Sequence, residues 1–265
     1  ELVRQYAEGY LQADPAAYAA ARADHAAYFA VWMKAQEQRL QSAEQAQAIE
    51  AVSATIDNIR AAWRWGVSQC DPAILNQICY PFGWYAEIYG LHREAAALYA
   101  AGHAALRPLL ASAPSHLVQR IYHLMYGMEG WHSLRYDPLK AISQMQTSYA
   151  ALQHIDDPEA RFQVAIGISY VVGSGGDLAQ ALNLLEACLD DARAANMPWG
   201  IATAESVRLL IGVLFGDFAL VRRHLPTAEQ HAQAVGDQRA IGNVLYTRAS
   251  LALHEGQSAE AEAIY

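Results

Sequence analysis

Residue patterns that usually indicate catalysis or metal binding are weak in this sequence. Two Asp-Asp pairs, at 156–157 and 190–191, are of a type that binds magnesium in all-helical enzymes, where a further carboxylate on the same helical face shares the ion. The first pair is followed by Pro158 and Glu159, a run typical of a helix N-terminus, where carboxylates offset the helix dipole. We therefore expect no metal centre at either pair.

Histidines, glycines and cysteines give no stronger indication. No two of the 10 histidines are three or four residues apart, the spacing that places two imidazoles on one face of a helix around a metal. The glycine cluster VGSGGD (172–177) lacks the lysine of a phosphate-binding loop, and Cys188 falls where a small residue recurs. We expect a hairpin turn and an inert core cysteine there, and a protein without catalytic residues, metal or cofactor.

Aromatic and polar side chains at recurring helical positions are the remaining candidates for a binding site. Counted back from each predicted turn, they fall on one face of successive helices, and aromatic walls with a few polar groups suit a peptide or a drug-sized ligand. The alternative, that several of them only pack the next hairpin, stays open. The candidate groove residues are Tyr80, Trp84, Glu87, His123, Tyr126, Glu129, Gln163, Tyr170 and Tyr246, with small recesses expected at Gly130 and Gly173.

The candidate residues must be positioned by helices, and the chain is rich in helix-forming residues. Alanine, the best helix former, supplies about a fifth of the 265 residues, against only 9 Pro and 17 Gly. Turn residues recur every 40 positions at Tyr136, Gly176, Gly216 and Gly256, and Gly90 adds a unit 46 residues before Tyr136. At fixed distances after each turn come a small residue (valine in one unit), a large apolar residue and a second small residue. The pattern predicts stacked pairs of antiparallel helices, each covering the apolar face of its neighbour.

Composition excludes several classes of protein. The net charge of -9 lacks the positive footprint of a nucleic-acid binder. Three cysteines are too few for a disulfide framework and favour a reducing, cytoplasmic location. No apolar run reaches the roughly 18 residues of a membrane-spanning helix. We therefore expect no direct contact with nucleic acid and none with a membrane.

The first 72 residues depart from the repeat and predict helices over 1–14, 15–40 and 44–69. They contain LVRQYAEGYL (2–11), ADHAAYFAVW (23–32) and the start of DNIRAAWRWGVSQCDPA (57–73). This run resembles the segment that leads from a winged-helix element into the repeat domain of bacterial signal-transduction ATPases, related to the maltose-regulon activator and to antibiotic regulatory proteins. The family pattern Asp-Asn-Leu-Arg-Ala-Ala-x-x-Trp is kept here except for Ile59 in place of the leucine.

The repeating unit is similar to the tetratricopeptide repeat, with a period of 40 residues in place of the usual 34. The resemblance implies a sensor arm and docking surface joined to an upstream nucleotide-binding module, which lies outside this sequence because no G-x-x-x-x-G-K-[ST] motif occurs. Arg60 and Arg64, one helical turn apart beside two tryptophans, are the candidate docking residues for that module. The alternative is a solvated arginine pair.

We therefore expect an all-α, right-handed solenoid of tetratricopeptide-like hairpins, with linking helices over 1–72 and the repeat array over 73–265. Because the chain starts without Met and stops within a helical stretch, we expect it to be part of a longer protein. The leading function is a non-catalytic sensor and interaction domain of a cytoplasmic regulatory ATPase, a transcriptional regulator, which binds a peptide, protein or small-molecule effector in its concave groove. A free-standing peptide-binding scaffold is the alternative, and an all-α enzyme is a third possibility.

Overall fold

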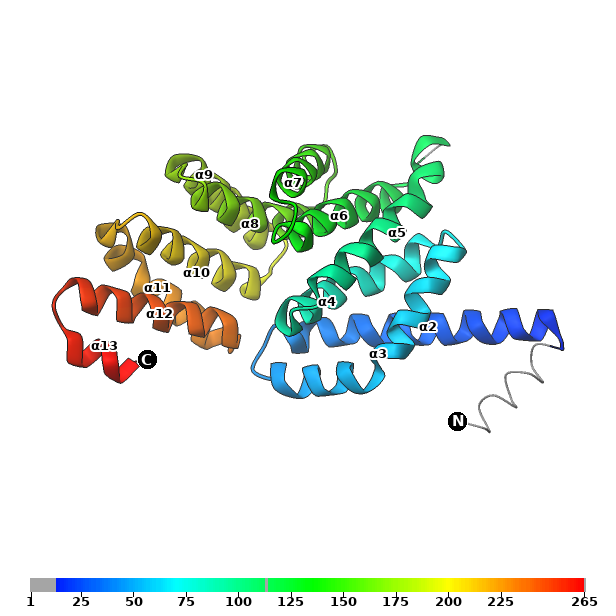
Figure 1. Cartoon of the computed structure of the whole chain (residues 1–265), viewed down its shortest axis with the longest axis horizontal. Coiled ribbons are helices and arrows are strands. Elements are labelled where there is room, and N and C mark those ends of the chain that lie inside the picture. The colour runs from blue at the N-terminus through cyan, green and yellow to red at the C-terminus, as the bar shows by residue number, and fades with distance from the viewer. Residues whose placement is uncertain (1–12, 113, 265) are drawn as a thin grey trace.

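The structure, a computed structural model, describes residues 13–112 and 114–264. These residues form twelve helices and no strand, so the predicted all-α class is confirmed (Figure 1). The helices are α2 (Pro15–Leu40), α3 (Gln45–Ser68), α4 (Pro72–Tyr89), α5 (His92–Ser112), α6 (His116–Ser133), α7 (Pro138–Leu152), α8 (Pro158–Ser174), α9 (Leu178–Ala194), α10 (Pro198–Leu214), α11 (Phe218–Val235), α12 (Gln238–His254) and α13 (Ser258–Ile264). The predicted helix over 1–14 lies almost entirely outside the described residues. None of the described helices is both long and apolar enough to cross a bilayer.

Most helices begin at an aspartate whose carboxylate accepts hydrogen bonds from first-turn backbone N–H groups, which otherwise have no partner. At four of these caps the next residue is proline, whose fixed backbone angle suits the first helical position. One of the caps is Asp157, so the predicted helix N-terminus at the first acidic pair is confirmed. The capping residues are Asp14, Asp71, Asp137, Asp157, Asp177, Asp217 and Asp237.

The predicted turns lie between the two helices of each hairpin. Gly90, Gly176, Gly216 and Gly256 all have positive φ, between 67° and 103°, a conformation that glycine adopts without steric cost. The small residues that follow each turn are buried in the packing between helices, as are the large apolar residues that the structure describes. The small ones are Ala95, Ala141, Ala181, Val221 and Ala261, and the large ones are Tyr99, Met145, Leu185 and Leu225.

The helices before the repeats share a core with them. One apolar cluster runs from Ala26 in α2 to Ile211 in α10, and the indole N–H of Trp63 in α3 donates to the backbone oxygen of Leu98 in α5. The expected boundary at residue 72 coincides with the start of α4, but packing continues across it. Residues 13–72 therefore form the first layer of the helical stack.

The stack bends into an arch, with α7 and α9 on its outer side and α6 and α8 toward its inner side (Figure 1). The two arms meet: the rings of Trp84 in α4 and Trp199 in α10 pack edge to face, with centroids 5.2 Å apart. Beside them, the side-chain amide of Gln45 donates to the Asp237 carboxylate at 3.4 Å. The predicted helical stacking thus includes a contact across its concave side that an open spiral lacks.

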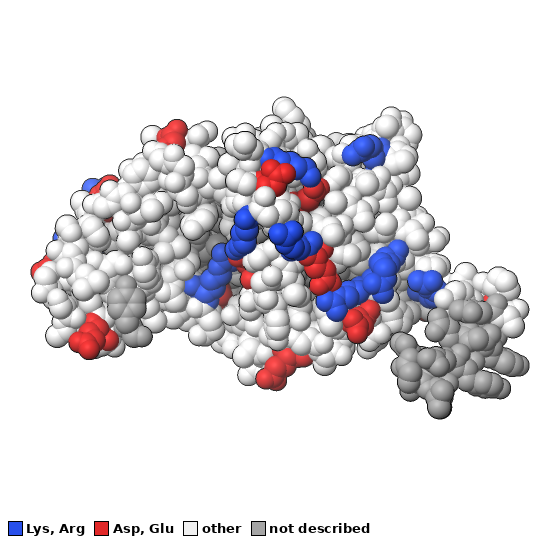
Figure 2. Space-filling model, viewed as in Figure 1, with Lys and Arg blue, Asp and Glu red and all other residues white. Residues whose placement is uncertain are grey.

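Charged residues are unevenly distributed on the surface. On the face shown in Figure 2, lysine, arginine and acidic side chains gather in a band across the middle, and most of the remaining surface is uncharged. Only 17% of the residues are charged, which agrees with the broad uncharged areas on this face.

Candidate functional site

A pocket of about 280 Å³ lies on the inner side of the arch and is lined by α4, α6, α8, α10 and the start of α12. These are the first helices of successive hairpins, so the repeat brings residues far apart in sequence to one place. Aromatic rings supply much of the wall, and two of them, Tyr80 and Trp84, contact Trp199 of the opposite arm. The aromatic lining residues are Tyr80, Trp84, Trp131, Tyr170 and Trp199.

Two acidic and two basic residues line the pocket, and they are Glu87, Asp237, Arg135 and Arg239. Glu87 accepts hydrogen bonds from the Trp131 indole at 2.9 Å and from Arg135 at 3.1 Å. Burial alone would raise the pKa of Glu87, but Arg239, Arg135 and the Trp131 N–H outweigh it and hold this pKa below its usual value. The guanidinium of Arg239 lies 4.9 Å from the centre of the Trp84 ring. Both carboxylates, of Glu87 and Asp237, already have protein donors, whereas the two arginines are exposed and can meet a negatively charged ligand group.

Three lining residues hold a buried polar atom without a hydrogen-bond partner among the described residues. They are Gln163 through Oε1, Trp199 through Nε1 and Thr203 through Oγ1. An unpaired buried polar atom costs free energy that a ligand with matching donors and acceptors recovers. The wall therefore combines aromatic surface with a few convergent polar groups, the usual composition of a small-molecule site.

The structure places five of the nine predicted groove residues in the pocket wall and four outside it. Tyr246 is 46% exposed on α12, and Tyr126 packs against His103. The two expected recesses are filled, because a Cβ on Gly130 would lie 2.8 Å from the Ala141 backbone oxygen, and one on Gly173 would lie 3.0 Å from Ile211. The residues in the wall are Tyr80, Trp84, Glu87, Gln163 and Tyr170, and those outside it are His123, Tyr126, Glu129 and Tyr246.

The predicted docking arginines differ in their surroundings. Arg60 pairs with Glu94 of α5 at 2.5 Å and with Asp57 at 2.9 Å, so it connects α3 to α5. These bonds raise the pKa of the Arg60 guanidinium further above its already high value. Arg64 is exposed on α3. A docking role for the pair stays a prediction, and Arg64 is the residue whose charge a partner can reach.

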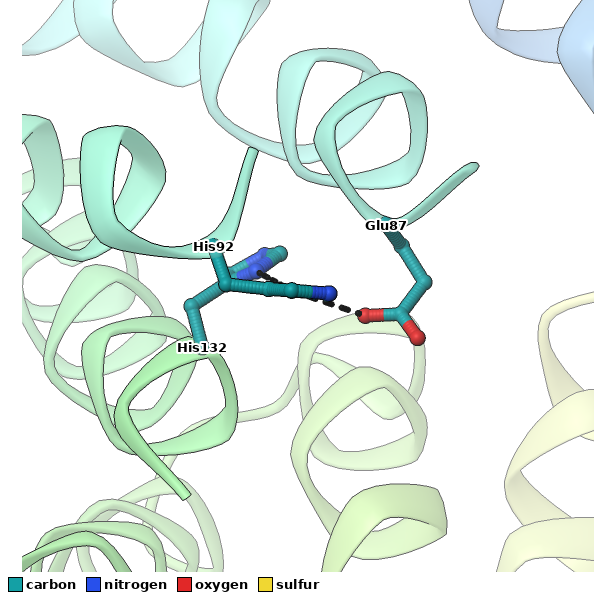
Figure 3. A group of neighbouring side chains, drawn as sticks. All are labelled: Glu87, His92 and His132. Carbon is teal, nitrogen blue, oxygen red and sulfur yellow. Dashed lines mark hydrogen bonds and ion pairs between the residues drawn. The ribbon is translucent and has the colours of Figure 1, made fainter. Parts of the chain in front are cut away.

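A second cluster of functional groups lies where three helix ends meet (Figure 3). Glu87 near the end of α4, His92 at the start of α5 and His132 near the end of α6 point their side chains toward one another, and their ligand atoms all lie within 4.8 Å of one another. Helical spacing could not reveal this cluster, because each residue belongs to a different helix. The signal that could have found it is topological: α4 ends where α5 begins, and the stacking places the end of α6 beside that turn.

Comparisons with known protein families and with curated proteins found no match to this chain. The pocket and the surrounding side chains therefore carry the functional argument.

Proposed function

We propose that the chain is a non-catalytic ligand-binding domain that recognises a small, largely aromatic molecule in the pocket on the inner side of the arch. The observation that carries this proposal is the convergence of five aromatic side chains and three buried polar atoms without a partner among the described residues, from four helices, on one pocket of about 280 Å³. Aromatic rings bind flat ligands by offset or edge-to-face stacking, and the polar atoms fix their orientation.

A small molecule fits this pocket better than an extended peptide does. A peptide groove needs open ends, whereas here the arms meet through Trp84 and Trp199 and the Gln45–Asp237 hydrogen bond. The volume lies near the lower end of the roughly 300–1,000 Å³ of typical small-molecule sites. The exposed guanidinium groups of Arg135 and Arg239 favour a ligand that carries an anionic group beside its ring system.

The pocket is placed to convert binding into a change of shape. Its lining comes from both arms of the arch, so a ligand that contacts both arms stabilises the closed arrangement over a more open one. We infer a sensor role of this kind within a right-handed, tetratricopeptide-like array of a bacterial signal-transduction ATPase, with the upstream module in contact with the first helices. In the alternative, a free-standing scaffold, the pocket is the same but no nucleotide-binding motif precedes the chain in its gene.

Binding of 8-anilinonaphthalene-1-sulfonate, a fluorescent aromatic anion, tests the proposal. We expect one molecule per folded chain, with affinity reduced about fivefold by Tyr170→Ala, because loss of one stacking ring removes on the order of 1 kcal/mol. Tyr28→Ala is the matched control, since Tyr28 is an exposed tyrosine on α2 that does not line the pocket. Absence of stoichiometric binding, or equal affinity in both variants and the parent chain, would contradict the proposal.

A further inference from the structure

We propose that Glu87, His92 and His132 form a binding site for a divalent transition-metal ion, with zinc as the principal candidate and one coordination position left open. The three side chains converge from the ends of α4 and α6 and the start of α5 (Figure 3). Glu87 also lines the ligand pocket, but this proposal does not rest on the proposed function.

The separations of the ligand atoms match a metal site. The two Nδ1 atoms of His92 and His132 are 3.3 Å apart, and Nδ1 of His92 is 3.7 Å from Oε2 of Glu87. Bonds of about 2.0 Å to a tetrahedral zinc ion place neighbouring ligand atoms about 3.3 Å apart. The first of these separations already fits, and all three ligand atoms lie within 4.8 Å of one another.

The donor set has the right chemistry. Two neutral imidazoles and one carboxylate are the protein ligands of many zinc sites that keep a fourth position open, and they also suit other first-row divalent ions. Burial lowers the pKa of both His132 and His92, which favours the neutral rings that bind metal ions. The neighbouring arginines and the Trp131 N–H lower the pKa of Glu87, which favours the carboxylate.

Without an ion, one proton serves both Nδ1 atoms, because a neutral imidazole carries one N–H and the two atoms lie 3.3 Å apart. Oε2 of Glu87 accepts a hydrogen bond from the Trp131 indole, but it lies 3.7 Å from Nδ1 of His92, beyond hydrogen-bond distance. The carboxylate therefore has no hydrogen bond to the nearer imidazole, whereas a cation at the centre would use a lone pair of each of the three groups.

Neighbouring residues hold the proposed ligands in place. The indole of Trp131 donates to Oε2 of Glu87, and the ring of Tyr99 stacks on His132 with centroids 5.7 Å apart. Such supporting contacts orient ligands in known metal sites. Arg135 donates to the other carboxylate oxygen, Oε1, so Oε2 accepts only from Trp131 among the described residues and keeps a second lone pair for the ion. Its positive charge opposes a bound cation, so removing that charge should strengthen binding.

Titration of zinc into the whole chain, with the heat of binding measured by calorimetry, tests the site. The absorption spectrum of bound cobalt(II) reports the coordination geometry. We expect one high-affinity zinc per chain, weakened at least tenfold by His92→Ala or His132→Asn and strengthened by Arg135→Gln. His116→Ala is the matched control, because His116 is the first residue of α6 as His92 is of α5, and it is exposed.

Far-UV circular dichroism shows which variants keep the fold. If the buried His132 variant does not fold, the partly exposed His92 decides the question. Zinc affinity that is the same in His92→Ala and in the parent chain would overturn the proposal, as would the absence of stoichiometric binding. Loss of zinc binding with anilinonaphthalene binding retained would separate this site from the pocket.

Discussion

Oε2 of Glu129 on α6 lies 2.6 Å from Nε2 of His103 on α5, and its other oxygen accepts a hydrogen bond from Lys140 on α7 at 3.0 Å. One buried carboxylate thus connects three consecutive helices. Burial alone would raise the pKa of Glu129, but hydrogen bonds from His103, Gln144 and Lys140 lower it to about 2. Glu129 was a candidate groove residue, but in the structure its side chain links α6 to α5 and α7.

The Glu129 connection predicts a pH-dependent stability. Because the folded pKa of about 2 is below the ordinary 4.5, the ionised group stabilises the fold above about pH 4.5, and this contribution is lost as the pH falls toward 2. We expect Glu129→Gln to lower the free energy of unfolding by about 2 kcal/mol at pH 7. Urea denaturation of the variant and the parent chain at pH 7, 4 and 3 measures the difference in their free energies of unfolding. This difference should shrink as the pH falls.

The control for this prediction is Glu50→Gln, which changes an exposed glutamate for which the structure gives no specific ion pair. We expect that variant to remain within about 0.5 kcal/mol of the parent chain at every pH. A Glu129→Gln difference that stays constant from pH 7 to pH 3 would show that the carboxylate charge does not contribute as described.

Two glycines in helices should respond to alanine in opposite directions. A Cβ on Gly102 of α5 would lie 2.6 Å from the Met125 sulfur and 2.9 Å from the Trp63 ring, whereas one on Gly242 of α12 meets nothing within 4 Å. We expect Gly102→Ala to destabilise the fold by about 1–3 kcal/mol through overpacking. Gly242→Ala should stabilise it by about 0.5–1 kcal/mol, because alanine favours a helix more than glycine does. Thermal and urea denaturation measure both, and a stabilising Gly102→Ala would contradict the close packing of α5 on its neighbours.

The contact between the two arms should control the width of the arch. Trp199 contacts Trp84 and Phe162, and Trp84 also donates its indole N–H to the Leu40 backbone oxygen at 3.0 Å. We expect Trp199→Ala to cost about 3–5 kcal/mol of stability and to increase the radius of gyration measured by small-angle X-ray scattering. Trp65→Ala, which changes a partly buried tryptophan on α3 away from the arm contact, should leave the radius unchanged. Equal radii for the two variants would exclude the arm contact as the closing element.

Local sequence patterns predicted the hairpins well and the site only in part. The turn glycines and the small residues after them obey rules that act over a few residues, so their positions and burial followed from spacing. The Trp84–Trp199 contact joins residues of hairpins far apart in the chain and depends on the accumulated curvature of the stack, which no local pattern encodes. The same reason explains why Tyr246 lies outside the pocket although Tyr80, at the corresponding position of an earlier hairpin, lines it. The meeting of His92 with His132 likewise required the packing of consecutive hairpins.

Fluorine NMR of the chain labelled with 5-fluorotryptophan tests the central claim most directly, because three of the six tryptophans line the pocket and three do not. Single Trp→Phe variants assign the six resonances, and 8-anilinonaphthalene-1-sulfonate is then titrated in. The account predicts that the resonances of Trp84, Trp131 and Trp199 shift with one common dissociation constant while those of Trp32, Trp63 and Trp65 stay in place. Shifts confined to the second group, or spread equally over all six, would contradict a ligand site on the inner side of the arch.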